Sequence, residues 1–289
     1  MSTAPRWQMV VFALAAGVAV LAQHMLNPGL GAQLLLLAPL VAILGLPHGA
    51  LDLPIAEALW PLDGWRGKLK FAALYLGLVA GVIGAWILAP GIALIAFLTY
   101  SVVHFSDDWA RAAPPLRWAG GLATIGAPAL LHHTEVTALF SYLAPEGIAA
   151  FCADVAATGG AAGAVLLTGA LLVAPQARGQ AAAEQFILWG AALLLPPLIF
   201  FAVYFCGLHS VRHFRATLRT LPQARRALVM AIGLSALVTI AALAVVSVQH
   251  DAVIAASPDT GMRVIFIGLA ALTVPHMILV DRFSRQPAP

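Results

Sequence analysis

The chain has 289 residues, of which 62% are hydrophobic and only 9% are charged, and its mean hydropathy is +0.94. Soluble globular domains carry about a quarter charged residues, so this composition excludes that class and indicates a polytopic membrane protein. No segment is polar enough for a separate soluble domain, so we expect one integral membrane domain over residues 1–289. The net charge of +3 comes from arginines in short loops, which favours contact with the lipid bilayer and gives no case for nucleic acid.

Long apolar runs joined by short turns predict an all-α bundle of transmembrane helices. The first run has the small residues of a signal peptide, but it is long and other apolar runs follow at once, which favours a transmembrane helix. Residues 136–175 mix apolar residues with the acidic Glu146 and Asp154 and contain no Lys or Arg. The remaining predicted spans are residues 7–25, 30–60, 71–88, 92–109, 118–131, 186–213, 227–248 and 263–280.

The distribution of basic residues predicts the orientation of these spans. Basic loops follow the helices that carry His48, His104, His209 and His276, while the opposite turns are uncharged or acidic. By the positive-inside rule, all four helices run from outside to inside, and both termini are cytoplasmic. An odd number of spans must then lie between His104 and His209, so residues 136–175 are expected to form two spans or none. The total is eight to ten helices.

Five histidines at the ends of apolar runs predict a metal site. They are His48, His104, His209, His213 and His276. Two of them are four residues apart and lie on one face of a helix. An ionisable group costs on the order of 2.5 to 3.5 kcal/mol at the centre of a membrane helix, so its repetition on several helices indicates a shared purpose. Neutral imidazoles suit iron, copper, nickel or zinc, and spacing alone does not choose among them.

Two aspartates accompany these histidines at helical spacing. Asp52 follows His48 by four residues, and Asp108 follows His104 by four. A metal-bound imidazole commonly donates its other N–H to a carboxylate, and each aspartate is placed to accept that hydrogen bond from a ligand on a neighbouring helix. The alternative is that the histidines are interhelical hydrogen-bond partners and the aspartates face water. Arg212 is interpreted as a partner of a lipid headgroup or of an aspartate.

Aromatic residues lie near the histidines at helical spacing. Phe201 and Phe205 precede the paired histidines in steps of four, and Phe97 and Tyr100 lie before His104. They predict a lipophilic tunnel that approaches the metal. Packing or an interfacial belt is the alternative interpretation of such a stripe.

Four motifs together resemble a known family. The set resembles the Brp/Blh family of membrane β-carotene 15,15′-dioxygenases, and it occurs in that family's order from the second helix to the last. The motifs read Gly45-Leu-Pro47-His48-Gly49-Ala50-Leu-Asp52, His104-Phe105-Ser-Asp-Asp108, His209-Ser210-Val-Arg212-His213 and Pro275-His276-Met277.

The resemblance implies an iron-dependent enzyme of the cell (inner) membrane that splits the central double bond of β-carotene with O2. The products would be two retinal molecules, which commonly supply a rhodopsin. A carotenoid is a long apolar rod that resides in the bilayer, so a membrane-embedded site can receive it directly.

The resemblance also implies roles for the histidines and aspartates. The residues that would hold Fe(II) are His48, His104, His209 and His213, and His276 would be a further ligand or a close neighbour. Asp52 and Asp108 would hydrogen-bond the ligands, with direct ligation to the metal as the alternative.

Other functional classes fit the sequence less well. The only lysines, Lys68 and Lys70, lie in a loop, which excludes a retinal-binding rhodopsin with a Schiff-base lysine in a helix. A metal-ion or proton transporter lined by His and Asp is the main alternative. A haem-binding electron carrier would show a Soret band. A di-iron desaturase would need repeated His-rich boxes, and a zinc intramembrane protease would need His-Glu-x-x-His; the sequence contains neither pattern.

Overall fold

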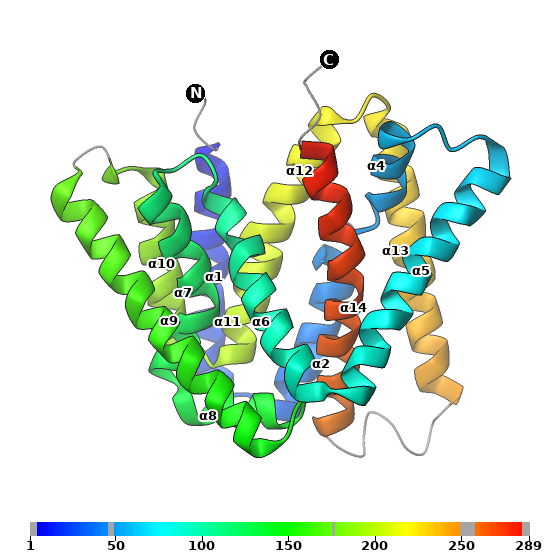
Figure 1. Cartoon of the computed structure of the whole chain (residues 1–289). Helices are drawn as coiled ribbons and strands as arrows, with labels where there is room; N and C mark the ends of the chain where they lie inside the picture. Colours follow the sequence, from blue (N-terminus) through cyan, green and yellow to red (C-terminus); the bar gives the residue numbers. More distant parts are fainter. Residues whose placement is uncertain (1–4, 46–48, 175–176, 249–257, 285–289) are drawn as a thin grey trace. The chain divides into compact units, whose positions relative to one another are not determined.

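The structure is a computed structural model, and it describes residues 5–45, 49–174, 177–248 and 258–284. Every regular element in these ranges is a helix (Figure 1), which confirms the predicted all-α polytopic bundle. Among the described residues, five helices are long and apolar enough to cross a membrane, so the protein is a multi-pass membrane protein. Those segments are Arg6–Leu26, Gly64–Leu88, Pro90–Trp109, Glu146–Val173 and Gly261–Phe283.

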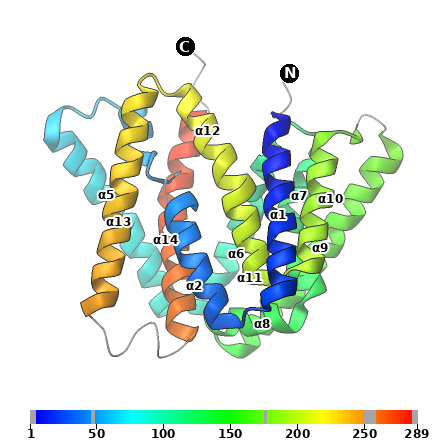
Figure 2. The ribbon, with the colours of Figure 1, turned by 180° about the vertical axis from the view of Figure 1, so that it is seen from behind.

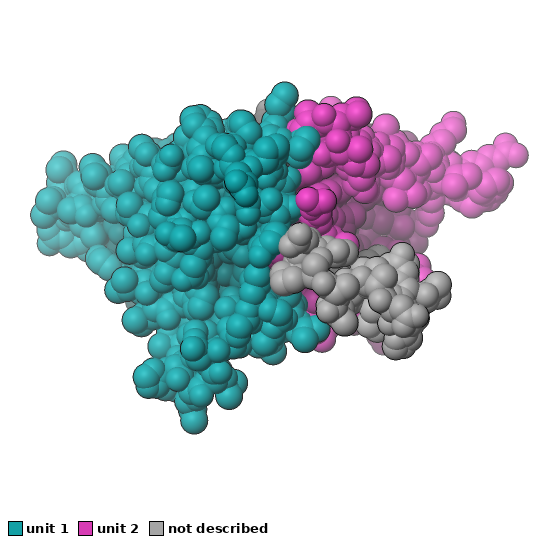
Figure 3. Space-filling view, turned by 90° about the horizontal axis from the view of Figure 1, so that it is seen from below, with its two compact units in different colours: residues 1–37, 90–212 teal, residues 38–89, 213–289 magenta. Residues whose placement is uncertain are grey.

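The chain forms two compact units (Figure 3). Unit 1 comprises Met1–Leu37 and Pro90–Arg212, and unit 2 comprises Ala38–Ala89 and His213–Pro289. Each unit therefore combines an early and a late part of the chain. The single membrane domain expected over residues 1–289 stays a prediction.

Unit 1 is a bundle in which glycines allow close helix contact. Gly126 and Gly160 meet backbone to backbone between α7 and α9, and a Cβ atom on either would overlap the other helix's backbone. Small residues of this kind permit close packing of membrane helices. Behind them, α1 lies beside α10 and α11 (Figure 2). The elements of unit 1 are α1 (Arg6–Leu26), most of α2 (Leu30–Leu40), α6 (Pro90–Ser106), η2 (Asp107–Trp109), α7 (Pro114–Leu131), α8 (His133–Ser141), α9 (Glu146–Val173), α10 (Gln180–Leu194), α11 (Pro197–Tyr204) and η4 (Phe205–His209).

The prediction of two spans or none within residues 136–175 is wrong. That stretch contains one long helix, α9, after the short α8. The apolar run that begins near Phe186 also does not form one helix, because α10 ends at Leu194 and α11 begins only at Pro197. Leu195 is extended and Pro196 is non-helical, as expected for consecutive prolines, which disfavour helical backbone in the preceding residue. The break is invisible to hydropathy because the run is apolar throughout.

Unit 2 packs three long helices around a small apolar core. Its elements are η1 (Val41–Gly45), α4 (Asp52–Leu59), α5 (Gly64–Leu88), most of α12 (Ser210–Thr220), α13 (Ala224–Val248) and α14 (Pro258–Ser284). Leu51, Ile55 and Leu279 are buried in that core, where α4 packs on α14. The predicted span of residues 30–60 is α2 followed by a π-helical turn, η1, and later by α4. Residues 46–48 lie outside the described ranges.

Candidate metal centre

His209 lies at the end of a π-helical turn inside unit 1. The turn η4 interrupts the helix between α11 and α12, and it places His209 fully buried in the bundle. Single π-helical turns inside α-helices occur frequently at functional sites. A buried imidazole needs polar partners, because an unpaired polar group in an apolar interior is unfavourable.

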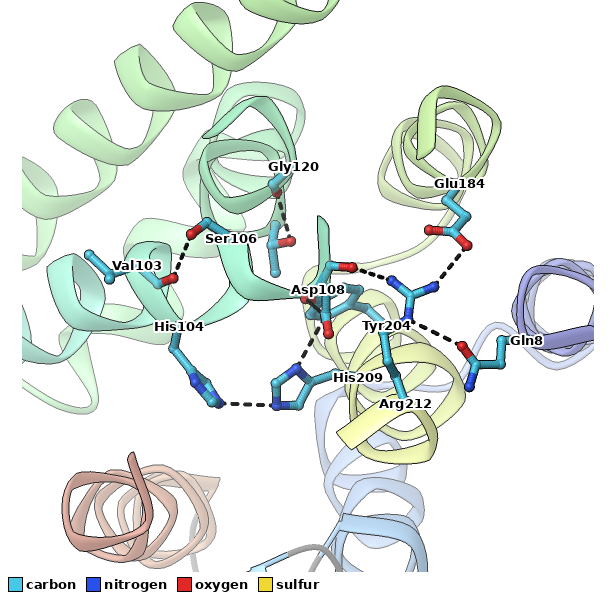
Figure 4. A network of polar contacts seen from close by, with 11 residues as sticks. Gln8, Val103, His104, Ser106, Asp108, Gly120, Glu184, Tyr204, His209 and Arg212 are labelled. Carbon is cyan, nitrogen blue, oxygen red and sulfur yellow. Dashed lines mark hydrogen bonds and ion pairs between the residues drawn. The ribbon is translucent and has the colours of Figure 1, made fainter. Parts of the chain in front are cut away.

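Asp108 is one of those partners. It lies on η2, the short 3₁₀ turn that ends α6, and its carboxylate is buried. Asp108 Oδ2 lies 3.1 Å from His209 Nδ1 and accepts a 2.5 Å hydrogen bond from the Tyr204 hydroxyl (Figure 4). An ionised carboxylate only accepts hydrogen bonds, so His209 carries its proton on Nδ1 and has a lone pair on Nε2.

That Nε2 atom faces a second imidazole. The Nε2 atoms of His104 and His209 lie 3.1 Å apart, and both rings are buried (Figure 4). Two imidazole nitrogens bound to one ion at about 2.1 Å, at a right angle, would be roughly 3.0 Å apart. The observed distance fits two neighbouring ligands of one metal ion, and it also fits a hydrogen bond donated by His104.

His213 lies one helical turn beyond His209, on the continuous helix that η4 and α12 form. Within unit 1, the imidazole of His209 lies beside the carboxylate of Asp108 and the imidazole of His104. Imidazole with carboxylate is a donor set that suits non-haem iron. The residues present therefore fit a metal ion of that kind.

Unit 2 holds a second arrangement of the same chemistry. His276 Nδ1 lies 2.6 Å from Asp52 Oδ1, and the Tyr75 hydroxyl donates a 2.8 Å hydrogen bond to Asp52 Oδ2. His276 and Asp52 are buried, and Tyr75 is half-buried. The carboxylate again joins a phenol to the Nδ1 of an imidazole, so a neutral His276 would have the same tautomer as a neutral His209.

The remaining predicted site residues are His48 and four aromatic residues. His48 lies outside the described residues. Phe201 stacks on Phe205 with ring centroids 5.2 Å apart, and Phe205 stacks on His209 at 5.5 Å. Phe97 and Tyr100 are half-buried on α6. The stacked rings lead to His209, but a tunnel stays a prediction.

Sequence reasoning did not find Tyr204 and Tyr75, which hold the two aspartates. A signal was present, because the chain has only four tyrosines and these two lie in apolar runs. A buried tyrosine hydroxyl usually has a hydrogen-bond partner, so each predicted a polar group on a neighbouring helix.

Comparisons with known proteins agree on one family. The family model described as beta-carotene 15,15'-dioxygenase matches residues 39–284. The chain is 34% identical, over 85% of its length and 92% of the relative's, to a protein named beta-carotene 15,15'-dioxygenase from uncultured marine bacterium 66A03. It is 29% identical, over 86% of its length and 84% of the relative's, to the probable beta-carotene 15,15'-dioxygenase Blh of Halobacterium salinarum. No solved structure matches significantly.

Proposed function

The chain belongs to the beta-carotene 15,15'-dioxygenase family, and from that premise we propose that it cleaves the central double bond of β-carotene with O2. The products are two molecules of all-trans-retinal. The observation that carries the proposal is the pair of facing Nε2 atoms of His104 and His209, 3.1 Å apart in a buried site. The alternative of a metal-ion or proton transporter is not favoured, because both relatives are named as dioxygenases.

Fe(II) is the proposed cofactor, and a bound ferrous ion with open coordination positions would supply O2 binding and activation. The proposed ligands are His48, His104, His209 and His213, with His276 as a further ligand or close neighbour. The support is the order of the motifs in the sequence and, within unit 1, the facing Nε2 atoms of His104 and His209. Neutral imidazoles do not offset the charge of a cation, so the buried carboxylates of the two aspartates would balance part of the charge of a bound ion.

The residues around the ligands fix their protonation and direction. Asp108 holds the proton of His209 on Nδ1, and the Tyr204 hydroxyl donates a second hydrogen bond to the same carboxylate oxygen of Asp108. Hydrogen-bond partners of this kind keep a ligand ring oriented and raise its basicity. In unit 2, Asp52 is placed to do the same for His276.

The substrate follows from the surroundings of the site. The phenyl rings of Phe201 and Phe205 stack in a row toward His209, and this apolar row supports the proposal of a water-poor approach for a polyene. A multi-pass protein can take β-carotene directly from the bilayer, and the cell (inner) membrane is the proposed location. The retinal formed would be available to a rhodopsin in the same membrane.

Expression in bacterial cells that accumulate β-carotene tests the proposal. We expect bleaching with retinal as the only carotenoid product, and no retinal from the His209→Ala variant. His24→Ala is the matched control, because His24 is exposed on α1. Persistent colour with the protein in the membrane and loaded with iron would exclude β-carotene as the substrate. Longer apocarotenals would place the cleavage at another double bond.

A further inference from the structure

Arg212 is a half-buried arginine of unit 1, three residues after His209. It donates three hydrogen bonds to three different elements (Figure 4). Nη1 binds the backbone carbonyl of Asp108 on η2 at 2.6 Å, Nη2 binds Glu184 Oε1 on α10 at 2.8 Å, and Nε binds Gln8 Oε1 on α1 at 3.3 Å. One guanidinium therefore joins the helix that carries His209 to the turn that carries Asp108.

The ion pair between Arg212 and Glu184 is nearly closed to solvent. The exposed fractions of the two side chains are 12% and 2%, and Gln180 donates a further hydrogen bond to Glu184 Oε1 at 2.9 Å. The loss of hydration on burying two charges offsets most of their attraction, so a buried pair is weak evidence for a gain in stability. What the pair does provide is a fixed orientation of the Arg212 guanidinium, because this planar group binds several acceptors at once.

The contacts of Asp108 show the consequence of the fixed orientation of the Arg212 guanidinium. The helix through η4 and α12 reaches this residue twice, since His209 meets its carboxylate and Arg212 meets its carbonyl. With its main chain and its side chain both tied to one helix, the carboxylate is held at a set position relative to the imidazole. Glu184 in turn holds the guanidinium that makes the second tie.

We propose that Arg212 and Glu184 are positioning residues that act through Asp108 to orient His209 for metal binding. The proposal rests on the proposed metal site, but it concerns residues outside the proposed ligand set, whose hydrogen bonds include those to Gln8, to each other and to the Asp108 carbonyl. A lysine at position 212 keeps the charge but cannot bind Glu184 and the Asp108 carbonyl with the same geometry. A glutamine at position 184 keeps an acceptor oxygen and removes the charge.

Metal titration of the purified, metal-free protein in detergent tests the proposal with Co(II) as the probe. Partners that orient a ligand typically contribute about 10- to 100-fold in metal affinity, so we expect Arg212→Lys to raise the Co(II) Kd by that factor and Glu184→Gln to raise it less. The visible Co(II) spectrum should change as well. Arg117→Lys is the control, because Arg117 makes a half-exposed ion pair with Asp107 nearby.

A double-mutant cycle separates positioning from general stability. If Arg212 acts through the carboxylate, Arg212→Lys should weaken Co(II) binding much less in an Asp108→Asn background than in the wild type. Additive effects, or an unchanged Kd in Arg212→Lys and Glu184→Gln, would overturn the proposal while the metal site stands. A wild-type chain that binds no Co(II) would overturn the metal site and this proposal together. Thermal unfolding of each metal-free variant identifies a variant that is merely unfolded, and Glu184→Gln then provides the test.

Discussion

The substitution Asp108→Asn isolates the charge of the carboxylate that holds His209. Oδ2 of Asp108 accepts from both the Tyr204 hydroxyl and the His209 ring. An asparagine carbonyl at that position accepts both hydrogen bonds without the charge. An asparagine NH2 group there is a donor, so the His209 proton must move to Nε2, the atom that faces His104. Both outcomes weaken the preference of Nε2 for a metal ion.

The expected magnitude follows from the hydrogen bonds that lose their charge. A hydrogen bond to a charged group contributes about 1.5 to 3 kcal/mol, and a neutral one about 0.5 to 1.5. The difference of about 1 to 1.5 kcal/mol corresponds to roughly a tenfold change in affinity. The tautomer shift adds to this effect, so we expect Asp108→Asn to raise the Co(II) Kd of the metal-free protein by about 10- to 100-fold. Retinal formation at limiting iron should fall in parallel.

The neighbouring residue offers the control. Asp107 is 45% exposed and pairs with Arg117 at 2.6 Å, and an exposed ion pair contributes about 0 to 1 kcal/mol. Asp107→Asn should therefore leave the Co(II) Kd and the retinal yield near their wild-type values. The reasoning is refuted if Asp108→Asn binds Co(II) as tightly as the wild type, or if both variants lose affinity equally.

Three further predictions concern other parts of the chain. Tyr204→Phe removes one hydrogen bond of about 1.5 to 3 kcal/mol from the buried, ionised carboxylate, so Co(II) affinity should fall about tenfold or more in the same titration. In unit 2, Tyr75→Phe should lower retinal yield less than Asp52→Asn, which also loses the contact to the imidazole; equal losses would contradict this order. Gly160→Leu should abolish the monodisperse size-exclusion peak, because α7 leaves no room for a side chain, whereas Gly169→Leu, in open space on the same helix, should keep it.

The histidine pair could be predicted from sequence because its geometry is local. His209 and His213 are four residues apart, and a helix places such residues on one face whatever surrounds it. The all-α class also follows from local information, since a bilayer forces apolar runs to satisfy their backbone within each segment. Both predictions depend on distances of a few residues along the chain.

The partners of the aspartates could not be predicted, because they depend on which helices pack together. Asp108 follows His104 at helical spacing, yet its side chain contacts His209, 101 residues away. Asp52 contacts His276, 224 residues away. Hydropathy assigns apolar runs to helices but carries no information about their neighbours. The helix break at Pro196 was missed for a related reason, since proline is tolerated inside membrane helices and does not by itself mark an end.

The two arrangements of tyrosine, aspartate and histidine solve one physical problem in the same way. Inside an apolar bundle, a histidine that offers Nε2 to a metal must satisfy its Nδ1–H, and a carboxylate brought in for that purpose must itself be stabilised. A phenol provides the second hydrogen bond without adding a charge, as Tyr204 does for Asp108 and Tyr75 for Asp52. Such a site is therefore defined by the set of a tyrosine, an aspartate and a histidine, and a histidine motif alone does not specify which carboxylate the histidine contacts. A tyrosine within an apolar run, together with an aspartate at the end of another helix, is the pattern that would point to the pairing before a structure exists.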